Sequence, residues 1–394
     1  MFSDRIDRIK PSLTLQMTSK VTELRSKGLN VINLSVGEPD FNTPANIRNA
    51  GIDAINNGIT RYTPGAGMPT LRQAACEKMA RDNNLHFSPE QVIISCGGKH
   101  SLYNACQVLF QTGDEVIIFT PYWVSFPDFV SVTGATPVFV GTNAKSQFEP
   151  NYDELEKAIN SNTKGIIINS PSNPTGGVWS DESIIKTLKI AKQNDLWVFS
   201  DECYEQLTYD NKFNSIATLT DDTEKILTFQ SCSKTYAMTG WRIGYTAGDA
   251  KVVKAMSKLQ GQSTSCPNSI AQSAAIEALT GDQSAVTEMK HVFMTRRSLI
   301  IDRLNAIEGV ECATPGGAFY VFPDFTSFIG KSLNGEKIIS ATQIAMDLIE
   351  NKYVVSVPGD GFGSPNNIRF SYAASDQNIN DAMDALEEIL NKIN

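Results

Sequence analysis

The 394-residue sequence has few residues of the types that build metal sites or disulfide frameworks. It contains three histidines, and its seven cysteines form no CxxC pair and no cluster with histidine. An odd number of scattered cysteines indicates neither a zinc site nor a disulfide scaffold. We therefore expect free thiols, no metal site and a reducing compartment, and histidine chemistry is not the expected mechanism.

Long apolar runs and an excess of positive charge are also missing. No run of about 18 apolar residues occurs, and the first residues lack the apolar stretch of a signal peptide. The chain has 43 acidic and 34 basic residues, a formal net charge of -9. Such a field repels nucleic acid and anionic membranes. We expect a cytoplasmic protein with no nucleic-acid or membrane partner.

The length, the composition and the pattern of apolar runs predict an α/β fold. The length suggests two to three domains, and 41% hydrophobic with 20% charged residues is a globular composition. From about residue 90, short β-branched runs alternate with helical stretches, as in a mostly parallel sheet sandwiched by helices. One such helix should begin after Ser180 and place on its apolar side Ile184, Ile185, Leu188 and Ala191. The runs are QVIISCGG, EVIIFTPYW, TPVFV, KGIIINSPSNP, LWVFSDE, KILTFQSCSK and WRIGYTAG.

A second, smaller α/β domain is expected after residue 283. A long helical stretch is followed by a strand in GGAFYVFPDF, a helix over 338–351, and strands in VVSVPG and NIRFSYA. The first 45 residues are too few for a domain of their own. We therefore expect an N-terminal arm (1–45) packing with the small domain, a large domain (46–283) and a small C-terminal domain (284–394).

Polar residues at the ends of the predicted strands suggest a ligand site, because open parallel sheets bind ligands beyond the carboxyl ends of their strands. Gly97 and Gly98 lead from a strand into a helix and could expose N–H groups to an anion such as phosphate. A tight turn without ligand would use the same glycines. Asp201 follows the hydrophobic strand LWVF, where a carboxylate needs a cationic partner or hydrogen bonds.

Lys234 ends the next strand run, with Ser231 and Ser233 before it and Arg242 eight residues after it. A lysine in this position alone is usually a solvated side chain. Together with Asp201, the set suits a pyridoxal phosphate enzyme. The lysine would form the Schiff base and carry protons, the hydroxyls and arginine would hold the phosphate, and Asp201 would pair with the ring nitrogen.

The ordered motifs SPSNPTGG (170–177), SDECYE (200–205), SCSKTYAMTGWRIGY (231–245) and NIRFSYA (367–373) resemble the class I and II aminotransferases of the fold-type-I pyridoxal phosphate superfamily. The resemblance extends from VGEPDFNTP (36–44) over nearly the whole chain. KPSLT, YTPGAGMPTLR, GGKHSLYN and PYWVS are similar to the prokaryotic-type aspartate aminotransferase subgroup.

This resemblance implies roles for further residues. Tyr204 would hydrogen-bond the ring's 3-oxygen, Asn173 that oxygen and the substrate carboxylate, and Trp123 would stack on the ring. Gly98 and Lys99 would join the phosphate cup through their backbone. Tyr62 would reach in from the second subunit of a homodimer. Arg369 would hold the substrate α-carboxylate as a fork, with the Gly37 backbone nearby.

The side-chain pocket decides the substrate. The subgroup's distal carboxylate contacts fall on Lys99 and Thr14. The resemblance thus implies transamination of L-aspartate with 2-oxoglutarate to oxaloacetate and L-glutamate. Alternatives are a glutamate/aspartate-prephenate or an aromatic amino acid aminotransferase. A fold-type-I lyase or decarboxylase, disfavoured by Arg369, and a ligand-sensing transcription factor, disfavoured by the acidic pI, come from other classes.

Overall fold

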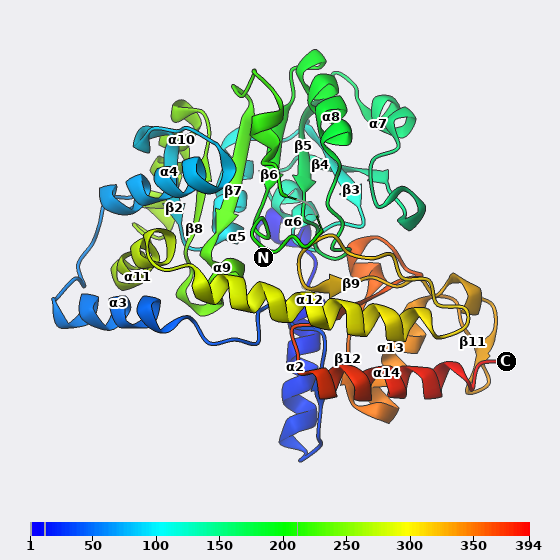
Figure 1. Ribbon diagram of the computed structural model, residues 1–394. Helices are drawn as coiled ribbons and strands as arrows, with labels where there is room; N and C mark the ends of the chain where they lie inside the picture. The colour runs from blue at the N-terminus through cyan, green and yellow to red at the C-terminus, as the bar shows by residue number, and fades with distance from the viewer. Residues whose placement is uncertain (1, 12, 211) are drawn as a thin grey trace.

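A seven-stranded sheet forms the centre of the larger part of the molecule (Figure 1). The computed structural model describes residues 2–11, 13–210 and 212–394, without the side chains of residues 14 and 15. The strand order is β2-β8-β7-β6-β5-β3-β4. The strands are β2 (Val92–Ser95), β3 (Glu115–Thr120), β4 (Thr136–Gly141), β5 (Thr163–Asn169), β6 (Trp197–Asp201), β7 (Ile226–Ser231) and β8 (Gly244–Ala247).

The sheet is mostly parallel, which confirms the predicted fold class. Strands β4, β3, β5, β6 and β7 run parallel, whereas β8 pairs antiparallel with both β7 and β2. Only residues 232–243 connect β7 to β8. This link holds only the short helical segments Cys232–Thr235 and Thr239–Trp241, and no helix long enough to cover a face of the sheet, as the connection between two parallel strands usually does.

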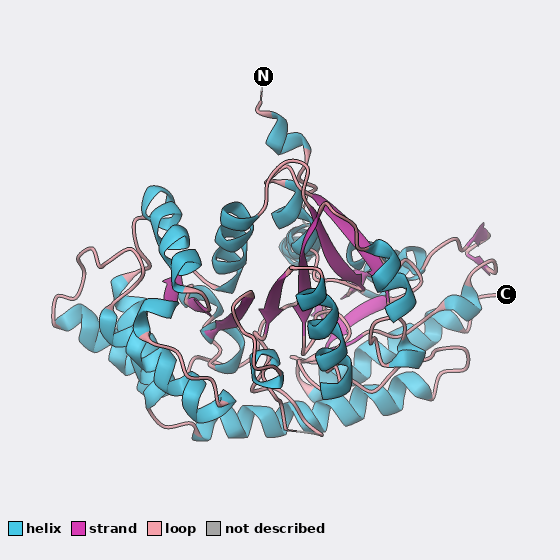
Figure 2. Ribbon diagram, turned by 90° about the horizontal axis from the view of Figure 1, so that it is seen from above, coloured by secondary structure: helices cyan, strands magenta, loops and turns pink. Residues whose placement is uncertain are grey.

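Helices cover both faces of the sheet (Figure 2). Alternate residues of β2, β3, β5, β6 and β7 belong to the apolar clusters on opposite faces. One layer contains α3 (Ala45–Asn56), α4 (Pro69–Asn83), α7 (Tyr152–Ala158), α8 (Asp181–Gln193) and α11 (Ser269–Thr280). The other contains α5 (Gly98–Leu109), α6 (Phe126–Ser131) and α10 (Ala250–Ser263). Burial on both faces explains why the strands are continuous apolar runs.

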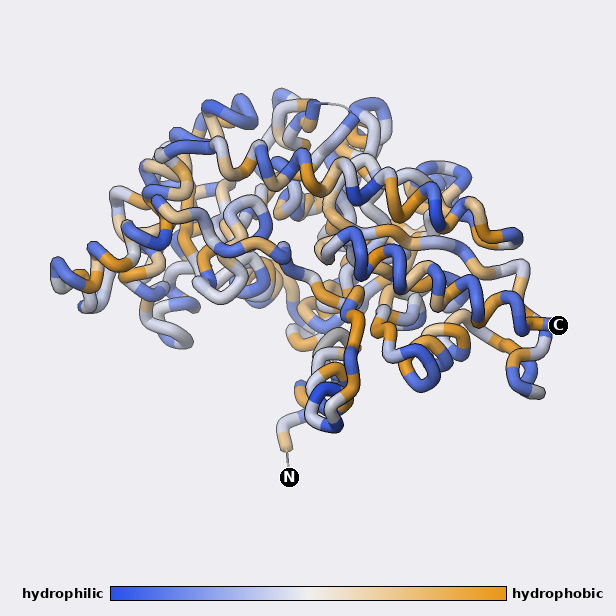
Figure 3. Tube along the Cα trace, turned by 60° about the horizontal axis from the view of Figure 1, so that its bottom comes forward, coloured by the Kyte–Doolittle hydropathy of each residue, from blue (hydrophilic) through white to orange (hydrophobic). Residues whose placement is uncertain are grey.

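The outer helices show the expected amphipathic pattern (Figure 3). Helix α8 starts after Ser180, whose side chain accepts a hydrogen bond from the Ser183 N–H, as predicted. Ile184 and Leu188 are buried. The expectation that Ile185 joins them was wrong: it is 49% exposed, because it lies about 100° around the helix from Ile184.

The smaller part contains a three-stranded antiparallel sheet, β13-β14-β9, packed against helices (Figure 1). Its elements are α12 (Ser284–Asn305), β9 (Tyr320–Val321), β10 (Ser332–Leu333), β11 (Glu336–Lys337), α13 (Ala341–Lys352), β12 (Val354–Val355), β13 (Val357–Pro358), β14 (Ile368–Ser371) and α14 (Asp376–Leu390). Of the strand predicted over 316–325, only Tyr320–Val321 forms a strand, β9. Helix α13 begins at Ala341 because Ser340 and Gln343 form a capping box.

The N-terminal segment lies against this smaller part. It contains α1 (Asp4–Asp7), α2 (Leu13–Ser26) and β1 (Ile32–Asn33), and β1 pairs in parallel with β12. Met17, Val21 and Leu24 of α2 share an apolar cluster with Phe322 and Phe362. The limits of the three expected parts, 1–45, 46–283 and 284–394, remain our proposal. Among the described helices, none combines the length and apolarity needed to span a membrane.

Candidate active site

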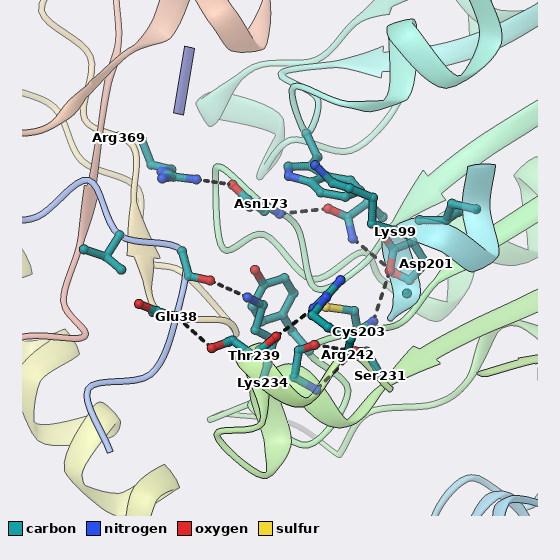
Figure 4. A pocket seen from close by; sticks show the side chains of 18 of the residues that line it. Glu38, Lys99, Asn173, Asp201, Cys203, Ser231, Lys234, Thr239, Arg242 and Arg369 are labelled. Carbon is teal, nitrogen blue, oxygen red and sulfur yellow. Dashed lines mark hydrogen bonds between the residues drawn. The ribbon is translucent and has the colours of Figure 1, made fainter. Parts of the chain in front are cut away.

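A cavity of about 370 Å³ lies beyond the carboxyl ends of the parallel strands (Figure 4). This is the edge at which open parallel sheets bind ligands. The predicted site residues that line it are Gly37, Gly98, Lys99, Trp123, Asn173, Asp201, Tyr204, Ser231, Ser233, Lys234, Arg242 and Arg369. Tyr62 is not among them and is 89% exposed. Thr14 lies in α2, and its side chain is outside the described residues.

Lys234 extends into the cavity from α9 (Cys232–Thr235), a short helix directly after β7. Ser231 caps this helix: its Oγ accepts a hydrogen bond from the Ser233 N–H at 3.1 Å, and the two hydroxyls lie 2.9 Å apart. The Lys234 ammonium donates to the Gly37 carbonyl. Burial lowers the pKa of Lys234, which favours the neutral amine that a base or nucleophile requires.

The Arg242 guanidinium packs directly against the N-terminus of α5. Gly97 precedes α5 with φ of 92°, and a Cβ there would lie 2.2 Å from the Arg242 guanidinium. Arg242 Nη1 donates to the Thr239 carbonyl at 2.8 Å. Free N–H groups of a helix start, an arginine and the hydroxyls of Ser231 and Ser233 line this corner together. Such a set suits a phosphate dianion.

Asp201 is a buried carboxylate that forms no salt bridge among the described residues, and the charge of Lys234 offsets the effect of its burial only in part. It ends β6 and is 6% exposed, and the Cys203 N–H donates to its Oδ1 at 3.2 Å. Burial is the main cause that raises the pKa of Asp201 to about 7. A buried acid of this kind is costly unless a cation neutralises it. The site thus lacks one positive group that a ligand could supply.

Arg369 forms the opposite wall, on β14. It is 1% exposed, and it donates from Nη1 to Asn173 Oδ1 at 2.8 Å and from Nη2 to the Ser35 carbonyl at 2.7 Å. Its Nε is buried and has no hydrogen-bond partner in the part of the chain that the structure describes. The guanidinium also lies over the Tyr320 ring, 4.5 Å from the centroid. Neither fixed contact is a carboxylate, so the charge is available for an anionic substrate group.

Tyr204, Lys99 and Trp123 also line the cavity. The Tyr204 and Tyr320 hydroxyls lie 2.8 Å apart, and burial raises the pKa of Tyr204 well above its usual value, so the phenol keeps its proton. Lys99 Nζ lies 5.0 Å from the centre of the Trp123 ring. Desolvation and then the charge of Arg242 lower the pKa of Lys99. Three cations besides Lys234 therefore face one cavity, which favours ligands with several negative charges.

Sequence reasoning missed several residues of this site. Asn169 ends β5, accepts from the Asn173 N–H at 2.8 Å and donates to the Asp201 carbonyl at 3.1 Å. The strand-end rule that identified Asp201 could have found it. Glu38 accepts from the Thr239 hydroxyl at 2.7 Å. Tyr320 carries no local signal, because only the tertiary fold brings it to Tyr204.

The chain matches the family Aminotransferase class I and II over residues 30–386, and it belongs to this family. It is 45% identical over 384 residues to a probable aspartate/prephenate aminotransferase of Rhizobium leguminosarum bv. phaseoli, covering 96% of each chain. It is 41% identical over 392 residues to an aspartate aminotransferase of Bacillus sp. (strain YM-2), covering 99% of each.

Solved structures agree. The aspartate aminotransferase from Rhizobium meliloti superposes with a TM-score of 0.96 at 37% identity over 100% of both chains. The aspartate aminotransferase from Thermus thermophilus with maleate gives a TM-score of 0.93 at 37% identity over 99% of both chains. The chain is thus an aminotransferase, and the cofactor of its family is pyridoxal 5'-phosphate.

The residues present fit this cofactor. Its pyridine nitrogen can provide the cation that buried Asp201 lacks, and its phosphate matches the corner formed by α5, the two serines and Arg242. Its aldehyde requires an amine, and Lys234 places one in the same cavity. These three demands are chemically different, and one cavity meets all of them.

Proposed function

We propose that the chain transfers the amino group of L-aspartate to 2-oxoglutarate, giving oxaloacetate and L-glutamate. The observation that carries this proposal is the cavity that holds Lys234, Asp201 and Arg369 together with a further cation, Lys99. A general amino-acid site needs one cation for the α-carboxylate. A second cation is of use to a substrate with a second carboxylate.

Pyridoxal phosphate supplies an aldehyde that condenses with amines and a protonated ring that accepts the electron pair left when the α-proton is removed. We propose that Lys234 would hold this group and that its Nζ would take the proton from the substrate α-carbon and pass it to the carbon that was the cofactor's aldehyde, so that the amino group stays on the cofactor. Burial of Lys234 favours the basic, neutral amine needed for this role. Asp201 keeps the ring nitrogen protonated, and Tyr204 donates to the ring oxygen.

The phosphate is held, in this proposal, by the Gly98 and Lys99 backbone, Ser231, Ser233 and Arg242. Trp123 stacks on the ring, and Asn173 contacts the ring oxygen and the substrate carboxylate. Arg369 holds the α-carboxylate beside the Gly37 backbone. The position of Arg369 in the cavity lining, without a carboxylate partner among the described residues, supports this assignment. An orienting fork that retains the carboxylate favours transamination over decarboxylation.

Lys99 and Thr14 are proposed to bind the distal carboxylate. Lys99 is a flexible point charge and imposes less planar geometry than an arginine fork, so acids of different shape can be accepted. This supports transamination of prephenate as a second candidate activity, the one named for the Rhizobium leguminosarum relative. The Thermus thermophilus structure with maleate, a small dicarboxylate, supports the first candidate.

We further propose a homodimer in which Tyr62 of one subunit completes the cavity of the other. Tyr62 is exposed and lies outside its own subunit's cavity. Ile52, Ile55 and Ile59, shortly before it in the chain, are also exposed, which is unusual for large apolar residues unless a partner covers them. A cytoplasmic location remains a prediction, supported by seven free cysteines.

A panel of amino donors tests the substrate assignment. The cofactor-loaded protein is mixed with aspartate, glutamate, alanine or tyrosine, and the change in its visible spectrum is followed. The aminated form is then mixed with prephenate. Aspartate and glutamate should convert the spectrum faster than alanine and tyrosine. Faster conversion by tyrosine would refute the assignment and favour an aromatic amino acid aminotransferase.

A further inference from the structure

A buried polar network lies behind the segment that carries Asp201 and Tyr204. The side chains of residues 201–205 fall into two groups, those that line the cavity and those that do not. Asp201, Cys203 and Tyr204 line the cavity. Glu202 and Glu205 do not line it, and both are buried, with 0% and 6% exposed. Two buried carboxylates next to the site need partners, and those partners fix the orientation of the segment.

Glu202 is held by hydrogen-bond donors alone. Its carboxylate accepts from the Ser200 and Ser215 hydroxyls, both at 2.7 Å, and from the Ile216 N–H at 3.0 Å. The side-chain amide of Gln230 donates to its Oε2 at 3.3 Å. The backbone N–H of Glu202 donates to the Phe229 carbonyl at 2.9 Å. This carboxylate therefore connects the end of β6 to β7.

Glu205 is held by a buried lysine. Lys78, which is 1% exposed, contacts Glu205 Oε1 at 2.5 Å, and the Asn83 side chain donates to Oε2 at 3.1 Å. Both of these partners belong to α4, and the Gln206 side-chain amide also donates to Oε2, at 2.7 Å. The pair joins the segment behind Tyr204 to a helix that packs on the sheet. A buried ion pair of this kind tolerates little displacement, because separation leaves two uncompensated charges.

Gln230 connects the two halves of this network. Its Oε1 accepts from Lys78 Nζ at 3.0 Å and from the Tyr245 hydroxyl at 3.1 Å. Its Nε2 donates to Asn83 Oδ1 at 3.1 Å and to Glu202. Both donors and both acceptor positions of the amide are used. Gln230 directly precedes Ser231 but is not among the residues that line the cavity.

We propose that Gln230 is a positioning residue for the cofactor: it holds Glu202, and through Lys78 and Asn83 also Glu205, in register with the strand that ends at Ser231. The ring contacts of Asp201 and Tyr204 and the phosphate contacts of Ser231 are then set by one buried amide. The inference rests on the cofactor roles proposed above for these three residues. Gln230 itself touches neither cofactor nor substrate.

The test compares three variants as cofactor-free and cofactor-loaded protein. Gln230→Leu removes all four hydrogen bonds at similar volume, and Tyr245→Phe removes one hydroxyl. Thr187→Ala, on α8, is the matched control: it is fully buried and loses one hydrogen bond, to the Ser183 carbonyl. The readouts are the Kd for pyridoxal phosphate, from quenching of tryptophan fluorescence, and the pH midpoint of the visible band of the bound cofactor.

Gln230→Leu should weaken cofactor binding by about tenfold or more and shift the pH midpoint, and Tyr245→Phe should weaken binding by about threefold. Thr187→Ala should change neither. The inference is overturned if folded Gln230→Leu keeps the parental Kd and midpoint, or if Thr187→Ala shifts both as much. Should Gln230→Leu fail to fold, Tyr245→Phe decides alone, and the parental Kd and midpoint in that variant overturn the inference.

The proposed function fails separately. In the parent enzyme, a visible band that disappears in Lys234→Ala supports the cofactor site whatever Gln230 does. A parent without a visible band, or a Lys234→Ala variant that keeps the band, would refute the cofactor site. A parent with the band, together with Gln230 variants whose Kd and pH midpoint equal those of the parent, would refute the positioning role alone.

Discussion

The cofactor-free chain should become more stable, not less, when Asp201 is replaced by Asn. In the folded chain, burial raises the pKa of Asp201 from 3.8 to about 7. Between these values the folded state binds more protons at this site than the unfolded state. Stability therefore falls as the pH rises through this window, and the penalty is complete above the folded pKa.

The magnitude follows from the shift. About three pKa units at about 1.4 kcal/mol each give a penalty on the order of 4 kcal/mol at pH 8. At pH 5 the penalty is about 1.7 kcal/mol, since only about 1.2 units of the window have been crossed. Asp201→Asn removes the ionisable group. The stability difference between variant and parent should thus grow by about 1.4 kcal/mol per pH unit up to pH 7 and stay constant above it.

Urea denaturation of both cofactor-free proteins between pH 5 and pH 8.5, at one protein concentration, measures this difference. Subtracting the parent removes the contributions of titrating groups that do not interact with Asp201. A stability difference that is independent of pH, or that shrinks as the pH rises, would refute the claim that the Asp201 carboxylate is buried without a compensating cation. With the cofactor bound, the parent should be more stable than Asp201→Asn. The positive ring nitrogen then neutralises the Asp201 carboxylate, whereas an asparagine amide carries no charge to pair with it.

Three further outcomes are expected. Arg369→Lys loses the fork geometry and should lower kcat/KM for aspartate by about 1.5–3 kcal/mol, roughly 10- to 150-fold; steady-state kinetics with less than a threefold change would contradict the role. Lys99→Ala should lower kcat/KM for aspartate far more than for alanine, and equal losses would reject a distal carboxylate contact. Lys78→Met leaves Glu205 charged and buried, so urea unfolding should show a loss of about 3–5 kcal/mol. Adding Glu205→Leu should recover most of it, and a single variant with parental stability would disprove the pairing.

Much of the site could be predicted because parallel strands bring their carboxyl ends to one edge. Asp201 and Lys234 are 33 residues apart in sequence, yet each follows an apolar strand run, so both were expected at this edge. Arg369 could not be placed this way. It lies on an antiparallel strand of the smaller part, and only the family motif NIRFSYA indicated it.

Other features depend on contacts that no local pattern records. The Tyr204–Tyr320 hydroxyl contact joins two parts of the chain through packing alone. The exposure of Ile185 depends on which side of α8 faces the sheet, and its spacing from Leu188 is also helical. In the sequence, Gln230 is a polar residue within a mostly apolar strand run. Its role could not be predicted, because its four hydrogen-bond partners come from three separate segments.

The central claim is that Lys234 holds pyridoxal phosphate and transfers the proton during transamination. The visible absorption spectrum of the purified protein, recorded before and after addition of L-aspartate, tests it most directly when Lys234→Ala is measured beside the parent. We predict a visible band that aspartate converts in the parent, and neither band nor conversion in the variant. A variant that still converts aspartate at the parental rate would contradict the account.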